Sequence, residues 1–487
     1  MDKLHADGLR FVDEQGRTRI FNGMNIQEKQ GGKTRFGYDL DDAFFEKCAA
    51  RGINLIRLCI VWENLEPRPG QYNESYLRSV DEVFDRAAKQ GIYIFLDLHQ
   101  DLYGDMGIGG GDGAPKWAQL DDGKKNRQQK VVWSENYMLS KAVRRAFDNF
   151  WANTNTHGRG LQDHFAALWA MLARRYGQHP ALFGYDFLNE PFPGTEGVQA
   201  GKAIVFSIVR NIFFNPKIKT GKLVGDLLRK ARRPHILDHF GGEVIRDITK
   251  AADKIAARFD LEKYSPFLNK MGAAVRRESQ NGFLMMEQSV FCNGGVPMSA
   301  PAIFVGGGRD RNQCYAPHAY DLTVDTPAYK YADNSRVSAF FAVIAQTQQR
   351  LQMPVVVGEW GGGDENDPSW FHHAQFLLDF FDRCQWSQTY WCYKEGCLDA
   401  PLMAQALCRS YPQAVAGKIE RYRSAQDAFE LEFTQAPEDA AETLLYLHKP
   451  FAEIDCDGEW EVARYESGAS IVRLRTRPGR HCVSVRF

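Results

Sequence analysis

The chain has 487 residues, of which 44% are hydrophobic and 25% are charged, so it can bury a large core and wholesale disorder is excluded. Sixty lysines and arginines against 61 aspartates and glutamates give a formal net charge of −1, so no global electric field attracts nucleic acid or an anionic membrane. An α/β barrel takes about 250 residues, and the length therefore suggests one large domain and one smaller one.

Short apolar runs recur along the first 400 residues, and a helical pattern follows most of them. Runs without polar alternation are typical of strands that are buried on both faces of a parallel sheet. Eight such runs in this length favour a closed (β/α)8 TIM barrel over an open sheet. The predicted strands are 20–26, 53–60, 92–98, 182–188, 283–286, 313–320, 354–358 and 389–393.

The stretch from about 195 to 280 interrupts this alternation and is predicted to be a helical insertion. Its segment 202–235 contains nine lysines or arginines and a single acid, Asp226, beside an apolar pattern. A basic and partly apolar helix can lie on an anionic bilayer surface, which would make the protein a peripheral membrane protein. It can also be a packed lid whose charges face water, and both interpretations stay open.

From about residue 415 the pattern changes to alternation of apolar and polar residues, in segments separated by Asp-Gly, Ser-Gly and Pro-Gly turn signals. The segments are 429–433, 460–465, 471–476 and 481–487. They predict a small antiparallel β-sandwich at 415–487, which follows a barrel domain at 1–410.

The ten cysteines are spread along the chain without a Cys-x-x-Cys pair, which argues against a structural zinc site and against a disulfide scaffold. We expect reduced, mostly buried thiols. The N-terminal residues lack the charged and apolar segments of a signal peptide, so we expect a cytoplasmic protein, although a signal that has been removed would leave the same sequence.

Two glutamates end two strongly apolar strands. Glu190 follows Phe187-Leu188-Asn189, and Glu359 follows the run 354–358. Polar residues at the C-terminal ends of barrel strands project into the mouth, where the chemistry of such barrels takes place. One carboxylic acid that protonates a leaving oxygen and one carboxylate that attacks the anomeric carbon can cleave a glycosidic bond. Either glutamate alone could instead form a structural salt bridge at the rim of the barrel. The presence of both glutamates at strand ends favours glycosidase chemistry.

Other strand ends carry side chains that suit such a site. Asn189 could donate to a sugar 2-hydroxyl, and Tyr320 could position the nucleophile. Arg57 could hold the nucleophile ionised through its charge and hydrogen bonds, which would keep the pKa of that carboxylate low. Further side chains suited to sugar hydroxyls or to stacking on a sugar ring are His99, Asp101, His318 and Trp391.

These residues resemble glycoside hydrolase family 5, whose members are (β/α)8 barrels that act with retention of configuration. The segments RLCIVWENLEPRPGQYNESYL, LDLHQDLYG and GGGDGAPKWA resemble its endoglycoceramidase and glucosylceramidase branch, and the resemblance covers residues 18–395. It implies that Glu190 is the acid/base and Glu359 the nucleophile, and that Asn189 contacts the sugar 2-hydroxyl. It also implies that Lys29, Asp101 and Trp117 lie at positions that contact sugar.

We therefore expect a retaining β-glycosidase that hydrolyses the bond between a glucosyl head group and a lipid such as glucosylceramide, by double displacement. This chemistry needs no cofactor and no metal ion. The expected partner is a glycolipid or another β-glucoside, and no nucleic acid is expected. Three alternatives stay open: a steryl-β-glucosidase, a β-glucosidase or endoglucanase acting on soluble β-glucosides, and a carbohydrate-binding barrel that no longer catalyses.

Overall fold

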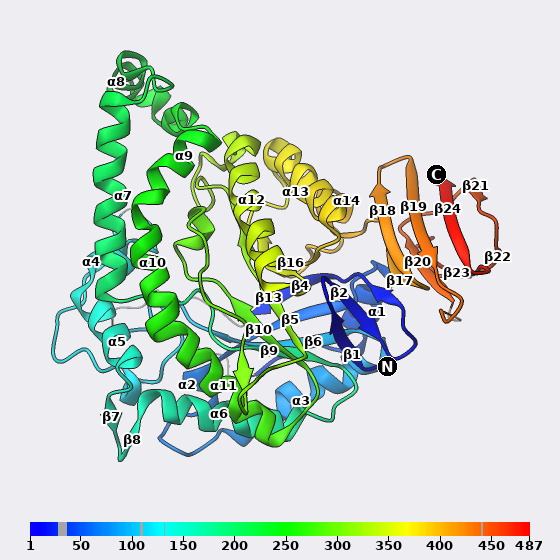
Figure 1. Cartoon of the computed structure of the whole chain (residues 1–487), viewed down its shortest axis with the longest axis horizontal. Coiled ribbons are helices and arrows are strands. Elements are labelled where there is room, and N and C mark those ends of the chain that lie inside the picture. Colours follow the sequence, from blue (N-terminus) through cyan, green and yellow to red (C-terminus); the bar gives the residue numbers. More distant parts are fainter. Residues whose placement is uncertain (28–36, 108–110, 131, 440–441) are drawn as a thin grey trace.

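A barrel of parallel strands forms the centre of the protein in the computed structural model, which describes residues 1–27, 37–107, 111–130, 132–439 and 442–487 (Figure 1). The strands are β4 (Asn22–Gln27), β5 (Leu55–Val61), β6 (Tyr93–His99), β9 (Leu182–Asp186), β10 (Phe283–Glu287), β13 (Gln313–Ala316), β14 (His318–Ala319), β15 (Val356–Gly361) and β16 (Ser387–Trp391).

The strand order around the barrel is β13-β10-β9-β6-β5-β4-β16-β15-β14, and every neighbouring pair is parallel. The ring closes where Tyr315 of β13 forms a parallel bridge with Val355, next to β15. β13 and β14 are two parts of one barrel strand, separated at Pro317, which has no N–H to donate. The predicted (β/α)8 architecture is confirmed.

Amphipathic helices surround the barrel. They are α1 (Asp42–Ala50), α3 (Glu74–Lys89), α6 (Leu161–Tyr176), α11 (Ser265–Glu278), α12 (Asn334–Leu351), α13 (Phe371–Cys384) and α14 (Pro401–Leu407). In α3 the Asn73 side chain caps the N-terminus by accepting from the backbone N–H groups of Ser75 and Tyr76. The buried residues of α3 recur every three or four positions from Tyr76 to Ala87, which places one apolar face on the barrel.

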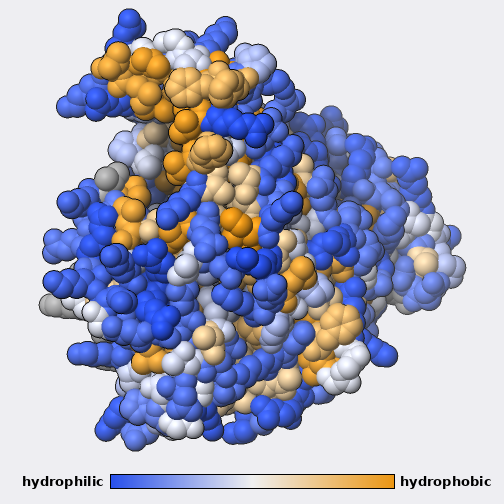
Figure 2. Space-filling view, turned by 60° about the vertical axis from the view of Figure 1, so that its left-hand side comes forward, coloured by the Kyte–Doolittle hydropathy of each residue, from blue (hydrophilic) through white to orange (hydrophobic). Residues whose placement is uncertain are grey.

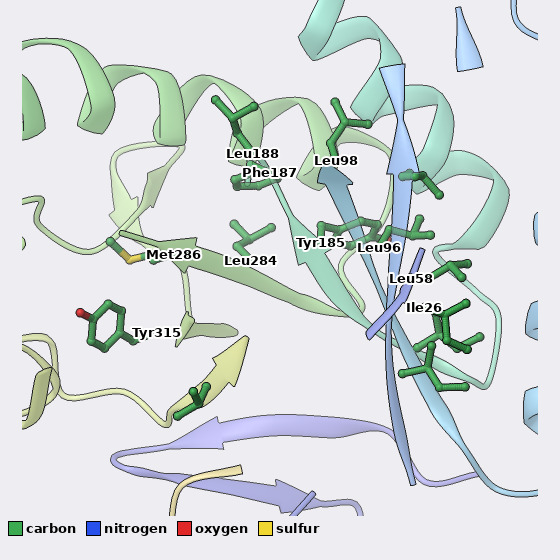
Figure 3. Close-up of a cluster of buried hydrophobic side chains, with 14 of the residues drawn as sticks. Ile26, Leu58, Leu96, Leu98, Tyr185, Phe187, Leu188, Leu284, Met286 and Tyr315 are labelled. Atoms are coloured by element: carbon green, nitrogen blue, oxygen red, sulfur yellow. The ribbon is translucent and has the colours of Figure 1, made fainter. Parts of the chain in front are cut away.

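The two faces of each barrel strand have different roles because side chains alternate along a strand. One buried apolar row runs across four adjacent strands, with one residue from each strand paired to the next (Figure 3). It consists of Leu58 of β5, Leu96 of β6, Tyr185 of β9 and Leu284 of β10. The residue before Leu58 is Arg57, which therefore points to the opposite face, into the barrel.

The N-terminal end of the barrel is closed by a strand from the start of the chain. The ring of Phe11 in β2 (Arg10–Asp13) packs against Phe21, Phe183 and Phe283 at centroid distances of 5.1–5.8 Å. This strand lies between β1 (Leu4–Asp7) and β3 (Thr18–Arg19), which pairs with β17 (Tyr411–Val415). The first twenty residues, predicted as part of the barrel unit, thus join a C-terminal sheet.

Two antiparallel sheets pack face to face in the C-terminal region. One continues from β17 through β20 (Thr443–Leu447), β23 (Ser470–Arg475) and β22 (Glu459–Arg464), and the other contains β18 (Lys418–Ser424), β19 (Ala428–Gln435), β24 (Gly479–Arg486) and β21 (Glu453–Asp455). Alternate residues of β19, among them Phe429, Leu431 and Phe433, share one buried cluster with Leu445 and Val472 of the other sheet. The predicted C-terminal β domain is confirmed.

The insertion consists of helices that project from one side of the barrel (Figure 1). They are α7 (Thr195–Phe214), α8 (Thr220–Leu228), the 3-10 segment η2 (Lys230–His239), α9 (Gly242–Thr249), η3 (Lys250–Ala252) and α10 (Asp253–Phe259). The predicted range 195–280 is too long, because α11 at its end packs on α6 as part of the barrel's helix layer. Among the described residues, no helix combines the length and the apolar character that crossing a bilayer requires. The ten cysteines, all described, form no disulfide, and seven are buried.

Asp260 begins the π-helical turn Asp260–Tyr264 between α10 and α11, and its side chain is fully buried. One carboxylate oxygen accepts from the backbone N–H of Ser299 at 2.6 Å. Burial nevertheless raises the pKa of Asp260 from 3.8 to about 7. Because the folded protein then binds this proton more tightly than the unfolded chain does, the contribution of Asp260 to stability falls as pH rises from 3.8 to about 7.

Asp260→Asn should remove this dependence, since asparagine does not titrate. Compared with the wild type, the variant gains up to about 1.4 kcal/mol in free energy of unfolding per pH unit in that window, and the difference is constant at higher pH. Urea unfolding at several pH values measures this. The exposed Asp427→Asn serves as the control and should show no such gain. A pH-independent difference for Asp260→Asn would contradict the assignment.

Candidate active site

A cavity of about 1610 Å³ lies at the C-terminal ends of the barrel strands. Seven of the predicted site residues line it, namely His99, Asp101, Asn189, Glu190, Tyr320, Glu359 and Trp391. They come from strands that are far apart in the sequence, and only the closing of the barrel brings them to one mouth.

The two predicted carboxylates face each other across a histidine. Glu190 lies four residues after the end of β9, and Glu359 lies in β15. One side-chain oxygen of each lies within 4.8 Å of the other. Nδ1 of His318 is 2.9 Å from Oε1 of Glu190 and 3.5 Å from Oε2 of Glu359. His318 is fully buried, and burial lowers its pKa to about 4, so the ring is neutral at pH 7.

Both oxygens of Glu359 accept hydrogen bonds. Nη1 of Arg57 donates to Oε1 at 2.6 Å, and the hydroxyl of Tyr320 donates to Oε2 at 2.9 Å. The Glu359 side chain is only 7% exposed, so the orientation of its carboxylate is set by these two donors and not by water. Tyr320 thus lies next to Glu359.

Arg57 is shared among four acidic side chains in the interior of the barrel. Besides Glu359 it contacts Asp97 at 3.1 Å, Asp186 at 3.2 Å and Glu287 at 3.2 Å, and all three of these are buried. Burial acts to lower the pKa of the Arg57 guanidinium, but the four carboxyl groups raise it well above its usual range. The Arg57 guanidinium is therefore a single buried positive charge that is surrounded by four buried acidic side chains.

The prediction that Arg57 keeps the pKa of Glu359 low is wrong in its net direction. Burial raises the pKa of Glu359 above its ordinary value, although His318 and Arg57 act to lower it. The effect of burial is larger than that of either neighbour. Burial and the neighbouring Asp186 also raise the pKa of Glu287 well above its usual range.

Glu190 is held by groups from three other barrel segments. Its Oε1 accepts from Nδ2 of Asn293 at 2.6 Å, in addition to the contact with His318. Its backbone φ is +41°, a left-handed conformation that is uncommon for a residue with a Cβ. The Glu190 N–H donates to Oε1 of Glu287 at 2.5 Å, and this bond stabilises the strained backbone.

Asn189 is oriented by its neighbours. Its Oδ1 accepts from Nη2 of Arg57 at 3.0 Å, and its Nδ2 donates to the backbone oxygen of Gln100 at 3.1 Å. An amide nitrogen carries two hydrogens, so one remains for a ligand.

His99 and Trp391 form one wall of the cavity. Their rings stack at a centroid distance of 5.3 Å and an interplanar angle of 15°. Nδ1 of His99 is 2.7 Å from Oδ2 of Asp97, which fixes the ring, and Nε2 is 3.8 Å from Oδ2 of Asp101. The wall therefore combines a flat aromatic surface with polar edges.

One predicted position does not join this group, and another lies outside the described residues. Trp117 is not among the described residues that line the cavity. Its indole N–H donates to the backbone oxygen of Glu66 at 3.1 Å, and its ring packs against Trp62 and His164. Lys29 lies outside the described residues.

Four further residues around the two glutamates were not predicted from the sequence, namely Asp97, Asp186, Glu287 and Asn293. Glu287 carried the same signal as the two predicted glutamates, because it ends the apolar strand β10. Asp97 and Asp186 lie at alternate positions of apolar strands and could have been predicted as interior residues. Asn293 lies in a short 3-10 turn, Cys292–Gly294, where no sequence pattern marks it.

The other part of the cavity is apolar and is built by the insertion. It is lined by Ile204, Ile208 and Ile212 of α7, by Leu223 and Leu227 of α8, by Ile236 and Leu237 of η2, and by Phe240, Ile245 and Ile248. The three isoleucines of α7 are four residues apart and so share one face of the helix. The cavity thus runs from two carboxylates to a wall of aliphatic side chains.

The sequence matches the family model described as cellulase, glycosyl hydrolase family 5, over residues 12–220 and 256–396. This chain belongs to glycosyl hydrolase family 5. It is a glycoside hydrolase, and a retaining mechanism is typical of its family. The unmatched residues 221–255 fall inside the insertion.

Endoglycoceramidase I of Rhodococcus hoagii is 32% identical to this family 5 enzyme over 197 residues, which are 39% of this chain and 37% of that protein. Glucosylceramidase of Rhizopus delemar is 28% identical in an alignment 250 positions long, which covers 40% of this chain and 36% of that protein. The matches therefore span less than half of these relatives. This chain also resembles the solved structure of endo-glycoceramidase II from Rhodococcus sp. in complex with a five-membered iminocyclitol. The superposition has a TM-score of 0.76 and covers 99% of each chain, at 24% sequence identity. It shows a shared fold.

Proposed function

We propose that this family 5 glycosidase hydrolyses the β-glucosidic bond between a sugar head group and a lipid aglycone, as in glucosylceramide or a related glycosphingolipid. The observation that supports this best is the single cavity that joins Glu190 and Glu359 to the aliphatic side chains of the insertion. A soluble β-glucan has polar sugars on both sides of the scissile bond. An aliphatic wall on one side suits an apolar aglycone instead.

In the first half-reaction Glu359 attacks the anomeric carbon, and the carboxylic acid of Glu190 gives its proton to the oxygen that leaves with the lipid. The sugar is then bound covalently to Glu359. In the second half-reaction Glu190 takes a proton from a water molecule, which attacks the anomeric carbon and releases the sugar. The oxygens within 4.8 Å of each other favour this route, because retaining enzymes separate the two carboxyl groups by about 5–5.5 Å and inverting enzymes by about 6.5–9.5 Å.

The neighbours of the two glutamates fit these roles. Arg57 and Tyr320 both donate to Glu359, so its carboxylate form is stabilised and aimed before the attack. His318 and Asn293 both contact Oε1 of Glu190, so they hold its carboxyl group in place at the mouth of the barrel. The stacked pair of His99 and Trp391 provides a face on which a pyranose ring can lie.

A comparison of three substrates tests the proposal. We expect kcat/KM for glucosylceramide in detergent micelles to exceed that for cello-oligosaccharides by at least about 100-fold, since only the lipid fills the apolar part of the cavity. Thin-layer chromatography of the digests shows which bond is cleaved. A preference for cello-oligosaccharides would refute a lipid aglycone.

A steryl glucoside is the third substrate, because the same aliphatic wall suits a sterol. Faster cleavage of the steryl glucoside than of glucosylceramide would assign the sterol as the aglycone. Saturable binding of all three without any released sugar would show a barrel that binds carbohydrate but does not catalyse.

A further inference from the structure

The projecting end of the insertion gathers most of the exposed large apolar side chains in the described part of the chain. We call residues 202–235 the tip segment; it spans most of α7, all of α8 and the start of η2. Eight of the fifteen exposed large hydrophobic residues lie in it, and the other seven are scattered. Those of the tip segment are Val205, Phe206, Val209, Phe213, Phe214, Val224, Leu227 and Leu228.

The exposure of these side chains is high. Phe206 is 74% exposed, Phe214 81% and Leu228 78%. Isolated apolar residues on a surface are ordinary, but a contiguous group of phenylalanines marks an interaction surface. Figure 2 shows apolar side chains gathered at the top of the molecule among hydrophilic ones.

The helix α7 is apolar on two faces. Ile204, Ile208 and Ile212 face the cavity, while Val205, Val209 and Phe213 are exposed one position further around the helix. An apolar helix face is normally covered by another part of the protein. The described part of the chain covers the isoleucine face and the neighbouring Ser207 and Asn211, but it leaves the face with Val205, Val209 and Phe213 exposed.

All nine lysines and arginines of the tip segment are exposed, next to these apolar side chains. Lys217 pairs with Glu243, and Arg232 lies 3.3 Å from Asp226. For the other seven, no acidic partner lies within 4.0 Å among the residues that the structure describes; they are Lys202, Arg210, Lys219, Lys222, Arg229, Lys230 and Arg233. The chain as a whole has a net charge of −1, so this positive charge is local.

We propose that the tip segment docks on the surface of a bilayer that contains anionic lipids, with Phe206, Phe213 and Phe214 in the interfacial region. The lysines and arginines lie at the level of the lipid phosphates. The cavity reaches this surface, because Leu227 both lines the cavity and is exposed. A glycolipid can then move from the bilayer into the cavity without crossing water. This last step rests on the proposed lipid substrate, whereas the docking itself does not.

The charge of the tip segment favours a lipid surface over a second copy of the chain. In a twofold dimer built on this surface, the same uncompensated lysines and arginines would face each other, and like charges at an interface repel. An anionic bilayer supplies phosphate groups to the same side chains.

Sedimentation of the full chain with vesicles tests the docking. The vesicles are phosphatidylcholine alone, or phosphatidylcholine with about one third phosphatidylglycerol to supply negative charge, and they contain no glycolipid. We expect at least about tenfold stronger binding to the anionic vesicles, and the binding weakens as salt is added. The triple variant Phe206→Ser, Phe213→Ser, Phe214→Ser should lose this binding.

The matched control is Phe304→Ser, which removes an exposed phenylalanine from the hairpin strand β11 (Phe304–Val305), outside the tip segment. Both variants should keep the wild-type melting temperature and the wild-type rate on a soluble aryl β-glucoside, because none of these phenylalanines lines the cavity. Equal vesicle binding by the wild type and the triple variant, or an equal loss in Phe304→Ser, would overturn the proposal.

Light scattering provides the second readout. A wild-type dimer that the triple variant converts to a monomer, without vesicle binding by either, would assign the surface to self-association and overturn the proposal. Vesicle binding by an enzyme that cleaves only soluble glucosides would refute the proposed lipid substrate and leave the docking intact.

Discussion

Glu359→Gln is expected to lower kcat/KM on an aryl β-glucoside by more than about 10⁴-fold, because an amide cannot form the covalent glycosyl-enzyme. The protein should stay folded. The amide oxygen can still accept from Arg57, and the Tyr320 hydroxyl can accept from the amide nitrogen in place of donating. The substitution also removes one of the four acidic groups around Arg57. The melting temperature should therefore change by only a few degrees, on the scale of about 1 kcal/mol.

Glu63 provides the matched control, since it is the third glutamate that lines the cavity in the described part of the chain and has no contact with Arg57 among the described ion pairs. Glu63→Gln should lower kcat/KM by less than about tenfold. Turnover of the aryl glucoside by Glu359→Gln at the wild-type rate, or an equal loss in Glu63→Gln, would show that Glu359 is not the nucleophile. Circular dichroism and thermal unfolding check that both variants are folded.

Glu190→Gln should show an effect that depends on the leaving group. With a glycolipid, whose leaving oxygen needs a proton, we expect kcat/KM to fall by about 10²–10⁴-fold. With a dinitrophenyl β-glucoside, whose leaving group needs no proton, the first half-reaction should proceed. The second then becomes limiting because no base activates water. A burst of dinitrophenol and a covalent hexosyl adduct on the intact protein measure this.

Azide separates the roles of the two glutamates. It attacks without the help of a base, so it should restore turnover in Glu190→Gln and give β-glucosyl azide, with retained configuration. An α-glucosyl azide from this variant, or no effect of azide at all, would contradict Glu190 as the acid/base. Glu359→Gln lacks the covalent route and should form no β-glucosyl azide.

The barrel and the positions of its main carboxylates could be predicted from the sequence because their signals are local. A strand that is buried on both faces must be continuously apolar, as in the run 354–358, and this pattern is visible without any knowledge of the neighbours. Polar residues at the C-terminal end of such a strand lie at the mouth of the barrel. Glu190 and Glu359 were found in this way.

The electrostatics of the site could not be predicted from the sequence. Arg57 lies in an apolar strand, and its position alone does not tell how many acids it contacts. The strand register aligns Asn25 with Arg57 and Asp97 with Asp186, and only this alignment makes one guanidinium the partner of four acidic groups. Burial is the largest influence on the pKa of Glu359 and raises it, although the ion pair with Arg57 acts in the opposite direction, and the degree of burial follows only from the folded barrel.

Taken by itself, the amino-acid order determined the eight barrel strands, the C-terminal β domain and the two glutamates, because each depends on the periodicity of a few consecutive residues. The tertiary structure alone decided that the first twenty residues join the C-terminal sheet, that Asn293 contacts Glu190 and that Trp117 packs outside the cavity. These contacts join residues that are distant in the chain. Their geometry depends on how strands, helices and loops pack together, which no local pattern records.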